Sequence, residues 1–384
     1  MISQIYFDHN ATTPIDPEVA ERIYQVFQQQ FANPASQHQT GQAARRALEN
    51  YRTGCLKLLG ADTRSFPADQ LIFSSGGTEA NNLAILGHAR KNQQLIVSAI
   101  EHPSIRLAAE HAAQVLGAQL QIISVDSTGQ CRLEHLQELL DQGPTSLVSL
   151  MLVNNETGVV QPVADAAKLC RARGVRIHCD AVQAIGKLPV SFRELGVDLL
   201  SFTPHKFNGP RGIGGLVVRP GADPAPLLFG GFQQRGLRPG TEDVALAAGC
   251  HLAMEKAVSS QPESFNRLVE VRELFLNNLR TLMRGTFAEN GSGATRSPHT
   301  LNLSFPGVER QTLLIAADVA GLAISTGSAC SSGSSEPSPV LLAMGLETGL
   351  VESSIRVSFG RDTTPAEAVR GAALLAQIVN DLRA

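Results

Sequence analysis

The strongest constraint on the fold is an alternation of short apolar runs with longer amphipathic runs between residues 71 and 203. The apolar runs show no polar alternation, which is typical of parallel strands covered on both faces. They are LIFSS (71–75), LIVSAI (95–100), LQIISV (120–125), SLVSLMLV (146–153), VRIHCD (175–180) and VDLLSFT (197–203). Gly117 and Gly174 follow helical runs, as helix ends commonly require. We therefore predict an α/β fold with a mostly parallel central sheet and right-handed crossovers.

The pattern changes in the remaining part of the chain. Two long helical stretches, 242–260 and 263–284, precede a strand at TLNLSF, a helix, two more strands and a final helix from Thr364. This order is typical of an α+β unit, and 384 residues suffice for one large and one smaller domain. We predict a large domain over residues 1–260 and a smaller α+β domain over residues 261–384. We expect the first 15 or so residues to pack with the smaller domain.

Charge and hydropathy exclude some classes of function. Lys and Arg total 32 against 35 Asp and Glu, so a general nucleic-acid coat is not expected. The apolar stretch at 147–153 is far shorter than the roughly 20 residues of a membrane helix. The N-terminus has no basic region followed by a long apolar run, so no secretory signal is expected. We expect no direct contact with nucleic acid and no membrane span.

The six cysteines indicate a reducing compartment. None forms a CxxC pair, and the chain is too long for so few cysteines to act as a disulfide scaffold. Five lie in apolar or helical surroundings, where cysteine is usually a small buried side chain. These five are Cys55, Cys131, Cys170, Cys179 and Cys250. A cytoplasmic location is therefore expected.

Three motifs follow predicted strands, where ligands bind in an open parallel sheet. Gly76-Gly77-Thr78 opens a helix, whose first amides and dipole favour a phosphate. Asp180 ends a buried strand, where a carboxylate needs a cationic or hydrogen-bonding partner. Lys206 follows the next strand, and a lysine desolvated in a cleft can form a Schiff base. Each motif alone also fits an ordinary role, as a packed turn, a helix N-cap or a surface lysine.

The combination of the three motifs is more specific than any one of them. Pyridoxal phosphate requires a phosphate cradle, an acid beside its ring nitrogen and a lysine for its aldehyde. All three occur here in chain order, each at the end of a strand. We therefore predict a pyridoxal phosphate site.

Other residues near strand ends have two interpretations each. His102 could stack on a flat ring and move protons, or could only begin a helix. Asn155 lies in a segment that could bind a ligand oxygen or form a turn. The basic segment 235–241 could reach a phosphate, including that of a neighbouring subunit, or form a plain surface loop. Arg356 could bind a carboxylate through two hydrogen bonds, or form a structural ion pair.

Cys330 differs from the other cysteines in its surroundings. Ten of the 13 residues from 327 to 339 are Gly, Ser or Pro, which predicts a mobile surface loop. A thiol on such a loop fits a nucleophile that must travel, and a tolerated surface cysteine is the alternative.

The motifs as a set resemble those of cysteine desulfurases, which are pyridoxal phosphate enzymes of the class-V aminotransferase group with fold type I. They are YFDHNATT, ANPASQH, SGGTEANN, EHPS, VNNETG, HCDAVQ, HKFNGPRGIGGL, RPGTE and GSACSSG. The resemblance covers nearly the whole chain. The long loop around GSAC resembles the loop of one branch of cysteine desulfurases, which supplies sulfur for iron–sulfur clusters and tRNA thiolation.

The resemblance implies a role for each matching residue. Lys206 would carry the cofactor as a Schiff base, and Cys330 would become the persulfide. His102 would stack on the ring and act in acid–base steps. Asp180 would pair with the ring nitrogen, and Gln183 would bond the phenolic oxygen.

The resemblance also implies how phosphate and substrate are bound. Five residues would hold the phosphate, Thr241 arriving from the second subunit of a homodimer: Gly77, Thr78, Thr203, His205 and Thr241. Asn155 and Arg356 would bind the carboxylate of L-cysteine, and Asn155 would also lie near the cofactor. Asn33 would line the substrate entrance. No resident metal is implied, although Cys330 could be a transient iron–sulfur ligand.

Two departures and three alternatives accompany the resemblance. Thr203 stands where the family usually has serine, and GGFQQRG lacks the family's usual His or Glu. A selenocysteine lyase or an aminotransferase would use the same scaffold, although a transaminase needs no mobile thiol. A non-catalytic sulfur-relay protein would be expected to lack Lys206 or Asp180. The predicted activity is thus conversion of L-cysteine to L-alanine, with the sulfur passed from Cys330 to an acceptor or scaffold protein.

Overall fold

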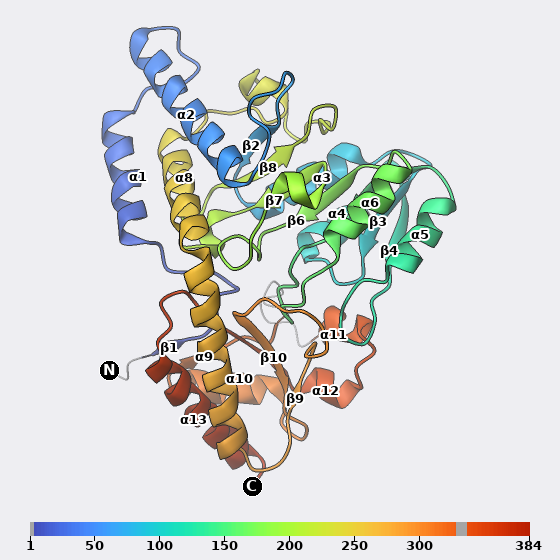
Figure 1. Ribbon diagram of the computed structural model, residues 1–384, viewed down its shortest axis with the longest axis vertical. Helices are drawn as coiled ribbons and strands as arrows, with labels where there is room; N and C mark the ends of the chain where they lie inside the picture. The colour runs from blue at the N-terminus through green and yellow to red at the C-terminus, as the bar shows by residue number, and fades with distance from the viewer. Residues whose placement is uncertain (1–3, 328–335) are drawn as a thin grey trace.

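The computed structural model describes residues 4–327 and 336–384. Figure 1 shows two parts along the long axis, a larger one around the central sheet and a smaller one that contains β1 (Ile5–Tyr6) and α13 (Pro365–Leu382). Helices α8 (Val244–Ser259) and α9 (Gln261–Leu282) follow one another from the larger part into the smaller (Figure 1). The predicted domain boundary near residue 260 coincides with the Ser260 junction between these helices, and the division itself stays a prediction.

The central sheet has seven strands in the order β2-β8-β7-β6-β5-β3-β4. They are β2 (Gln70–Ser74), β3 (Gln94–Ser98), β4 (Gln119–Ile123), β5 (Thr145–Ser149), β6 (Ile177–Asp180), β7 (Leu199–Phe202) and β8 (Gly214–Val218). β8 runs antiparallel to β2 and β7, and the other pairings are parallel. The predicted α/β class with a mostly parallel sheet is confirmed. The sequence pattern does not predict β8, because its glycine-rich start interrupts the apolar signal.

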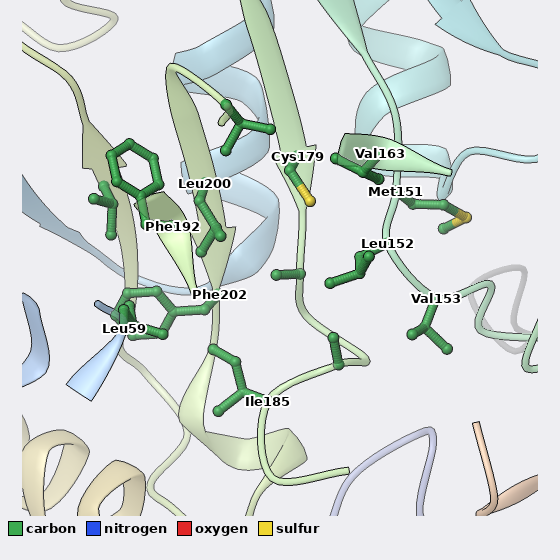
Figure 2. Packing of buried hydrophobic residues seen from close by; sticks show 14 of the residues in the cluster. Leu59, Met151, Leu152, Val153, Val163, Cys179, Ile185, Phe192, Leu200 and Phe202 are labelled. Carbon is green, nitrogen blue, oxygen red and sulfur yellow. The ribbon is translucent and has the colours of Figure 1, made fainter. Parts of the chain in front are cut away.

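Both faces of the sheet are buried. Leu199 and Leu200, which are neighbours in β7, belong to apolar clusters on opposite faces. Figure 2 shows part of the Leu200 cluster, in which Phe192, Phe202 and Leu59 lie close together. Because each face is covered, both sets of alternating side chains must be apolar, which accounts for the continuous apolar runs.

Helices and short 3₁₀ turns connect and cover the strands. They are α1 (Pro17–Gln29), α2 (Gln39–Leu58), α3 (Gly77–His88), α4 (Pro103–Leu116), α5 (Leu133–Asp141), α6 (Val163–Ala172), α7 (Phe192–Leu195), η1 (Pro204–Lys206) and η2 (Gln233–Gly236). α3 packs against α4, so the starts of these two helices can share one site. Within the described residues, every helix falls short of the length and apolar character that crossing a membrane requires.

The smaller part is built on a three-stranded antiparallel sheet with β10 in the middle. Its elements are β9 (Ala288–Glu289), β10 (Thr300–Ser304), α10 (Arg310–Val319), β11 (Leu322–Ala323), α11 (Pro339–Ala343), α12 (Thr348–Glu352), β12 (Ser354–Ser358) and α13 (Pro365–Leu382). β1 (Ile5–Tyr6) pairs in parallel with β11, and Ile5 and Phe7 enter the apolar cluster of this part. The N-terminal segment therefore packs here.

Residues 8–13 then pass between the two parts. The side-chain Nδ2 of Asn10 donates to Thr300 Oγ1 of β10 at 2.9 Å and to the Asn155 carbonyl at 3.0 Å. The Thr13 hydroxyl donates to the His205 carbonyl at 2.8 Å. This segment thus lies at the carboxyl ends of the central strands, where the sequence motifs were placed.

Candidate active site

Glycines hold the start of α3 against the sheet. No side chain caps this helix, because its N-cap residue is Gly76. A Cβ on Gly214 of β8 would lie 2.5 Å from the Gly76 carbonyl carbon, and one on Gly77 would lie 3.1 Å from Val182. Larger residues would therefore push the turn away from the strand ends. The first amides and the dipole of α3 are available there for an anion.

Thr203 and His205 flank this helix start with their polar groups already engaged. A Cβ on Gly77 would lie 3.4 Å from the methyl group of Thr203, whose hydroxyl donates to the Ile213 carbonyl at 3.0 Å. Nδ1 of His205 lies 3.1 Å from the Thr12 hydroxyl. Burial, followed by nearby lysine charges, lowers the pKa of His205 to about 4. His205 is thus neutral near pH 7.

Asp180 ends β6 with both carboxylate oxygens hydrogen-bonded. Oδ1 accepts from the Val182 amide at 2.9 Å, and Oδ2 accepts from Nδ2 of Asn81 at 2.8 Å. The side chain is only 5% exposed. The next helix, α7, begins at Phe192, so Asp180 is not a helix N-cap. A buried carboxylate held in this way can receive a charged ring N–H.

Gln183 lies near Asp180 and supplies a further polar group. Its Nε2 donates to the Asn10 carbonyl at 3.0 Å. Its Oε1 is buried and has no hydrogen-bond partner among the described residues. Such a group costs free energy unless a ligand or water satisfies it, so it marks a place for a polar ligand.

Lys206 closes η1, directly after β7. Its Nζ donates to the carbonyls of Asn10 at 2.5 Å and Ala11 at 2.8 Å. Because β6 and β7 are adjacent parallel strands, Asp180 and Lys206 leave the same edge of the sheet. The sequence analysis assigns no role to Asn10 or Ala11, although both fall in the YFDHNATT motif. Pairing of β1 with β11 brings them here.

His102 is the N-cap residue of α4. Its Nδ1 accepts from the Ser104 amide at 3.1 Å and lies 2.8 Å from the Ser104 hydroxyl. Thr78 and Asn82 of α3 line the same open depression as His102. Burial lowers the pKa of His102, and the charge of Asp180 opposes this shift. His102 thus begins a helix and also faces the start of α3.

Arg356 of β12 is buried in the smaller part, at 2% exposed. One nitrogen, Nη2, donates to Asp8 Oδ1 at 2.7 Å. The other, Nη1, donates to the carbonyls of Asn155 and Gly327, both at 3.1 Å. Its Nε is buried without a partner among the described residues. The ion pair considered from the sequence is therefore present, and Nε remains for a further acceptor.

The remaining predicted residues lie apart from this cluster or outside the described residues. Asn33 is exposed and its Oδ1 accepts from the Ala35 amide at 2.9 Å, within the α1–α2 connection. Thr241 is exposed on the loop that precedes α8. Cys330 lies outside the described residues, whose five cysteines are all buried and free.

The donors and acceptors at the strand ends fit pyridoxal phosphate. An uncapped helix start suits its phosphate, and the buried Asp180 carboxylate suits a protonated ring nitrogen. The unsatisfied Oε1 of Gln183 needs a polar partner, and Lys206 supplies an amine at the same edge. Within the described residues no cluster of His, Cys, Asp and Glu could hold a metal ion.

Comparison with known proteins finds relatives that match along nearly the whole chain. "Cysteine desulfurase IscS" of Dictyoglomus turgidum is 38% identical over 387 residues, covering 100% of this chain and 96% of the relative. The protein of the same name from Rickettsia akari is 41% identical, covering 99% and 92%. A NifS-like protein from Rickettsia africae, solved by X-ray crystallography, superposes with a TM-score of 0.87 at 31% identity and 99% coverage of both chains.

A family model describes the same relationship. The model for class-V aminotransferases matches residues 5–370, which is nearly the whole chain. A second solved structure, a "NIFS-like protein", superposes with a TM-score of 0.87 at 33% identity and covers 98% of this chain. The chain therefore belongs to the class-V aminotransferase family.

Proposed function

We propose that this protein is a cysteine desulfurase that converts L-cysteine to L-alanine and leaves the sulfur as a persulfide on Cys330. The observation that carries the proposal is the meeting of Lys206, Asp180 and the start of α3 at one edge of the sheet. Relatives named cysteine desulfurase match along almost the full length of the chain. In the overall reaction, the carbon–sulfur bond of cysteine breaks and a sulfur–sulfur bond forms at Cys330. A proton takes the place of sulfur on the product.

Pyridoxal phosphate, the cofactor of this family, supplies an aldehyde for the substrate amine and a ring that accepts electrons. The amides of the first turn of α3 bind its phosphate, with Thr78, Thr203 and His205 beside them. Asp180 would pair with the ring nitrogen, since two hydrogen bonds hold its carboxylate in place. Gln183 bonds the phenolic oxygen.

The remaining residues bind substrate and move protons. Lys206 Nζ would act as the general base that takes the α-proton from cysteine. Arg356 and Asn155 bind the substrate carboxylate, and the Nε of Arg356, which has no partner among the described residues, supports this role. The thiolate of Cys330 attacks the substrate sulfur, and His102 covers the ring.

The assembly and location belong to the same proposal. We infer a homodimer, with Asn33 at the substrate entrance and Thr241 completing the partner's phosphate site. Exposed Phe229 and Phe232, at 87% and 93%, lie on the same loop region as Thr241 and supply apolar area for a subunit contact. The sulfur acceptor is a second protein that serves iron–sulfur cluster assembly or tRNA thiolation. Free buried thiols are consistent with a reducing cytoplasm.

Incubation of the purified protein with L-cysteine, pyridoxal phosphate and a thiol reductant tests the proposal. Alanine and sulfide should form in equal amounts, and without reductant the persulfide should accumulate on Cys330. C330S should retain the cofactor and lose sulfide release, whereas full-rate release from this variant would refute the role of Cys330. Alanine formation that requires a keto acid would indicate a transaminase instead, and faster turnover of selenocysteine would indicate a lyase.

A further inference from the structure

Asn81 of α3 lies between Asp180 and Ser104. Its side chain is 1% exposed, and its Nδ2 donates to Asp180 Oδ2 at 2.8 Å and to the Ser104 hydroxyl oxygen at 2.9 Å. An ionised carboxylate can only accept, so the nitrogen of the amide must face Asp180. Both protons of this nitrogen are therefore used, one for each neighbour.

The direction of the next hydrogen bond follows from this arrangement. The Ser104 oxygen accepts from Asn81, so its single proton is free to point at Nδ1 of His102, which lies 2.8 Å away. The Ser104 amide also donates to the same Nδ1 at 3.1 Å. Nδ1 therefore receives two donors and carries no proton of its own.

His102 is consequently neutral, with its proton on Nε2. A proton on Nδ1 would point at the N–H of the Ser104 amide. The Ser104 hydroxyl would also have to rotate so that its oxygen accepts this proton. Within the described part of the chain, the charges of Asp180 at the end of β6, Lys206 of η1 and Arg356 of β12 act on this ring. The two cations oppose protonation and Asp180 favours it, while burial, the largest influence, lowers the pKa of His102.

We propose that Asn81 and Ser104 are positioning residues that hold His102 in its Nε2–H neutral tautomer and connect it to the Asp180 carboxylate. The inference rests on the proposed function, in which His102 covers the cofactor ring and Asp180 binds its nitrogen. The side-chain amide of Asn81 thereby connects Asp180, through Ser104, to His102. In the resting protein, the His102 ring is neutral, covers the cofactor ring and can donate a hydrogen bond through Nε2. It becomes a base only after Ser104 releases Nδ1.

Nitrogen-15 NMR of the histidine-labelled holoenzyme tests the tautomer directly. The signals of His102 are assigned by their loss in H102Q, and the wild-type ring should show a pyridine-like Nδ1 and a protonated Nε2. S104A should shift the pH midpoint of His102 by about one unit or place part of the proton on Nδ1, since one donor is lost. S104T keeps a hydroxyl and should restore the wild-type signals.

N81A tests the connection to Asp180. Loss of one hydrogen bond to the carboxylate should move the pH midpoint of cofactor absorbance and reduce kcat about tenfold, with KM changed less than twofold. N278A is the matched control, because Asn278 of α9 lies away from the site and its side-chain amide donates to the backbone carbonyl of Leu274 at 2.8 Å. It should change neither the absorbance midpoint nor the His102 signals.

Two results would overturn the inference. One is a wild-type His102 that carries its resting proton on Nδ1. The other is that N81A and S104A each fold well and keep the His102 signals and the absorbance midpoint of the wild type. Asn81 and Ser104 would then have only a packing role. The NMR measurement needs no substrate, so a wild-type protein that makes no alanine would defeat the proposed function and leave the tautomer result standing.

Discussion

The ammonium group of Lys187 donates a hydrogen bond to the backbone carbonyl oxygen of Lys206, with 2.5 Å between nitrogen and oxygen. Lys187 is only 8% exposed, and it belongs to the turn that follows β6. Burial, followed by the charge of Lys206, lowers the pKa of Lys187 to about 7. A second amine therefore supports the backbone of the proposed Schiff-base lysine at a considerable cost in desolvation.

Replacement of Lys187 by methionine should change how stability depends on pH. In the unfolded chain a lysine keeps its proton up to about pH 10.4, so between pH 7 and that value the unfolded state binds more protons than the folded state. The wild-type free energy of unfolding should therefore rise with pH across this window, and K187M should lack that rise. Accumulated over this window, the difference between the wild-type rise and that of K187M should amount to a few kcal/mol, on the order expected for a shift of several pKa units.

Urea unfolding at several pH values between 6.5 and 10 measures this difference. K57M, at an exposed lysine of α2, is the control and should follow the wild type. Parallel curves for wild type and K187M would contradict the prediction.

Glu101 should be protonated at neutral pH. Burial raises its pKa to about 8, against hydrogen bonds from the Ser98 hydroxyl at 2.6 Å and the Met151 amide at 2.8 Å that favour the ionised form. Because the folded pKa is the higher one, wild-type stability should fall as pH rises from about 4.5 to 8.

E101Q keeps an oxygen for both donors and cannot ionise. It should be as stable as the wild type near pH 5 and more stable at pH 8, as thermal unfolding would record. E101L removes the acceptor and should lose about 1–3 kcal/mol near pH 5, because the Ser98 and Met151 donors are left unsatisfied. A Glu101 that is ionised at pH 7 would make E101Q the less stable protein there.

Alanine at Gly214 should weaken cofactor binding. Its Cβ would lie 2.5 Å from the Gly76 carbonyl carbon, so the turn before α3 must move away from the strand ends. Displaced amides bind phosphate less well, and we expect the dissociation constant for pyridoxal phosphate to rise about tenfold or more, a cost of ~1.4 kcal/mol or more. Fluorescence titration of the cofactor-free protein measures it. G349A, where a Cβ meets nothing within 4 Å, should bind as the wild type does.

The sequence predicts those parts of the site that depend on strand order alone. Asp180 and Lys206 each end a strand that the apolar runs identify, and β6 and β7 prove to be neighbours. Helical starts at Gly77 and His102 follow from local capping and turn residues. These groups are expected at one edge because ligands of open α/β sheets bind at the carboxyl ends of the strands, while the chemical roles of the groups stay predictions.

The contacts that the sequence could not predict are those set by long-range packing. Asn10 and Ala11 reach Lys206 only because β1 pairs with β11, more than 300 residues later in the chain. The antiparallel β8 enters between β2 and β7 through close glycine contacts, which carry no periodic signal. Asn81 lies within the recognised SGGTEANN motif, but its two partners come from β6 and α4.

Lysine at position 356 should separate substrate binding from ion pairing. Arg356 contacts Asp8 and two backbone carbonyls at once, and its Nε has no acceptor in the described part of the chain. A lysine keeps the charge but lacks the planar fork, so it cannot serve all of these partners. We expect R356K to raise the KM for L-cysteine at least tenfold, about 1.4 kcal/mol, with unchanged cofactor content. Steady-state alanine formation gives both kcat and KM.

R173K, in the surface pair with Asp141, is the control for a conservative change and should match the wild type. If R356K lowered only the melting temperature and left KM unchanged, Arg356 would be the structural ion pair alone.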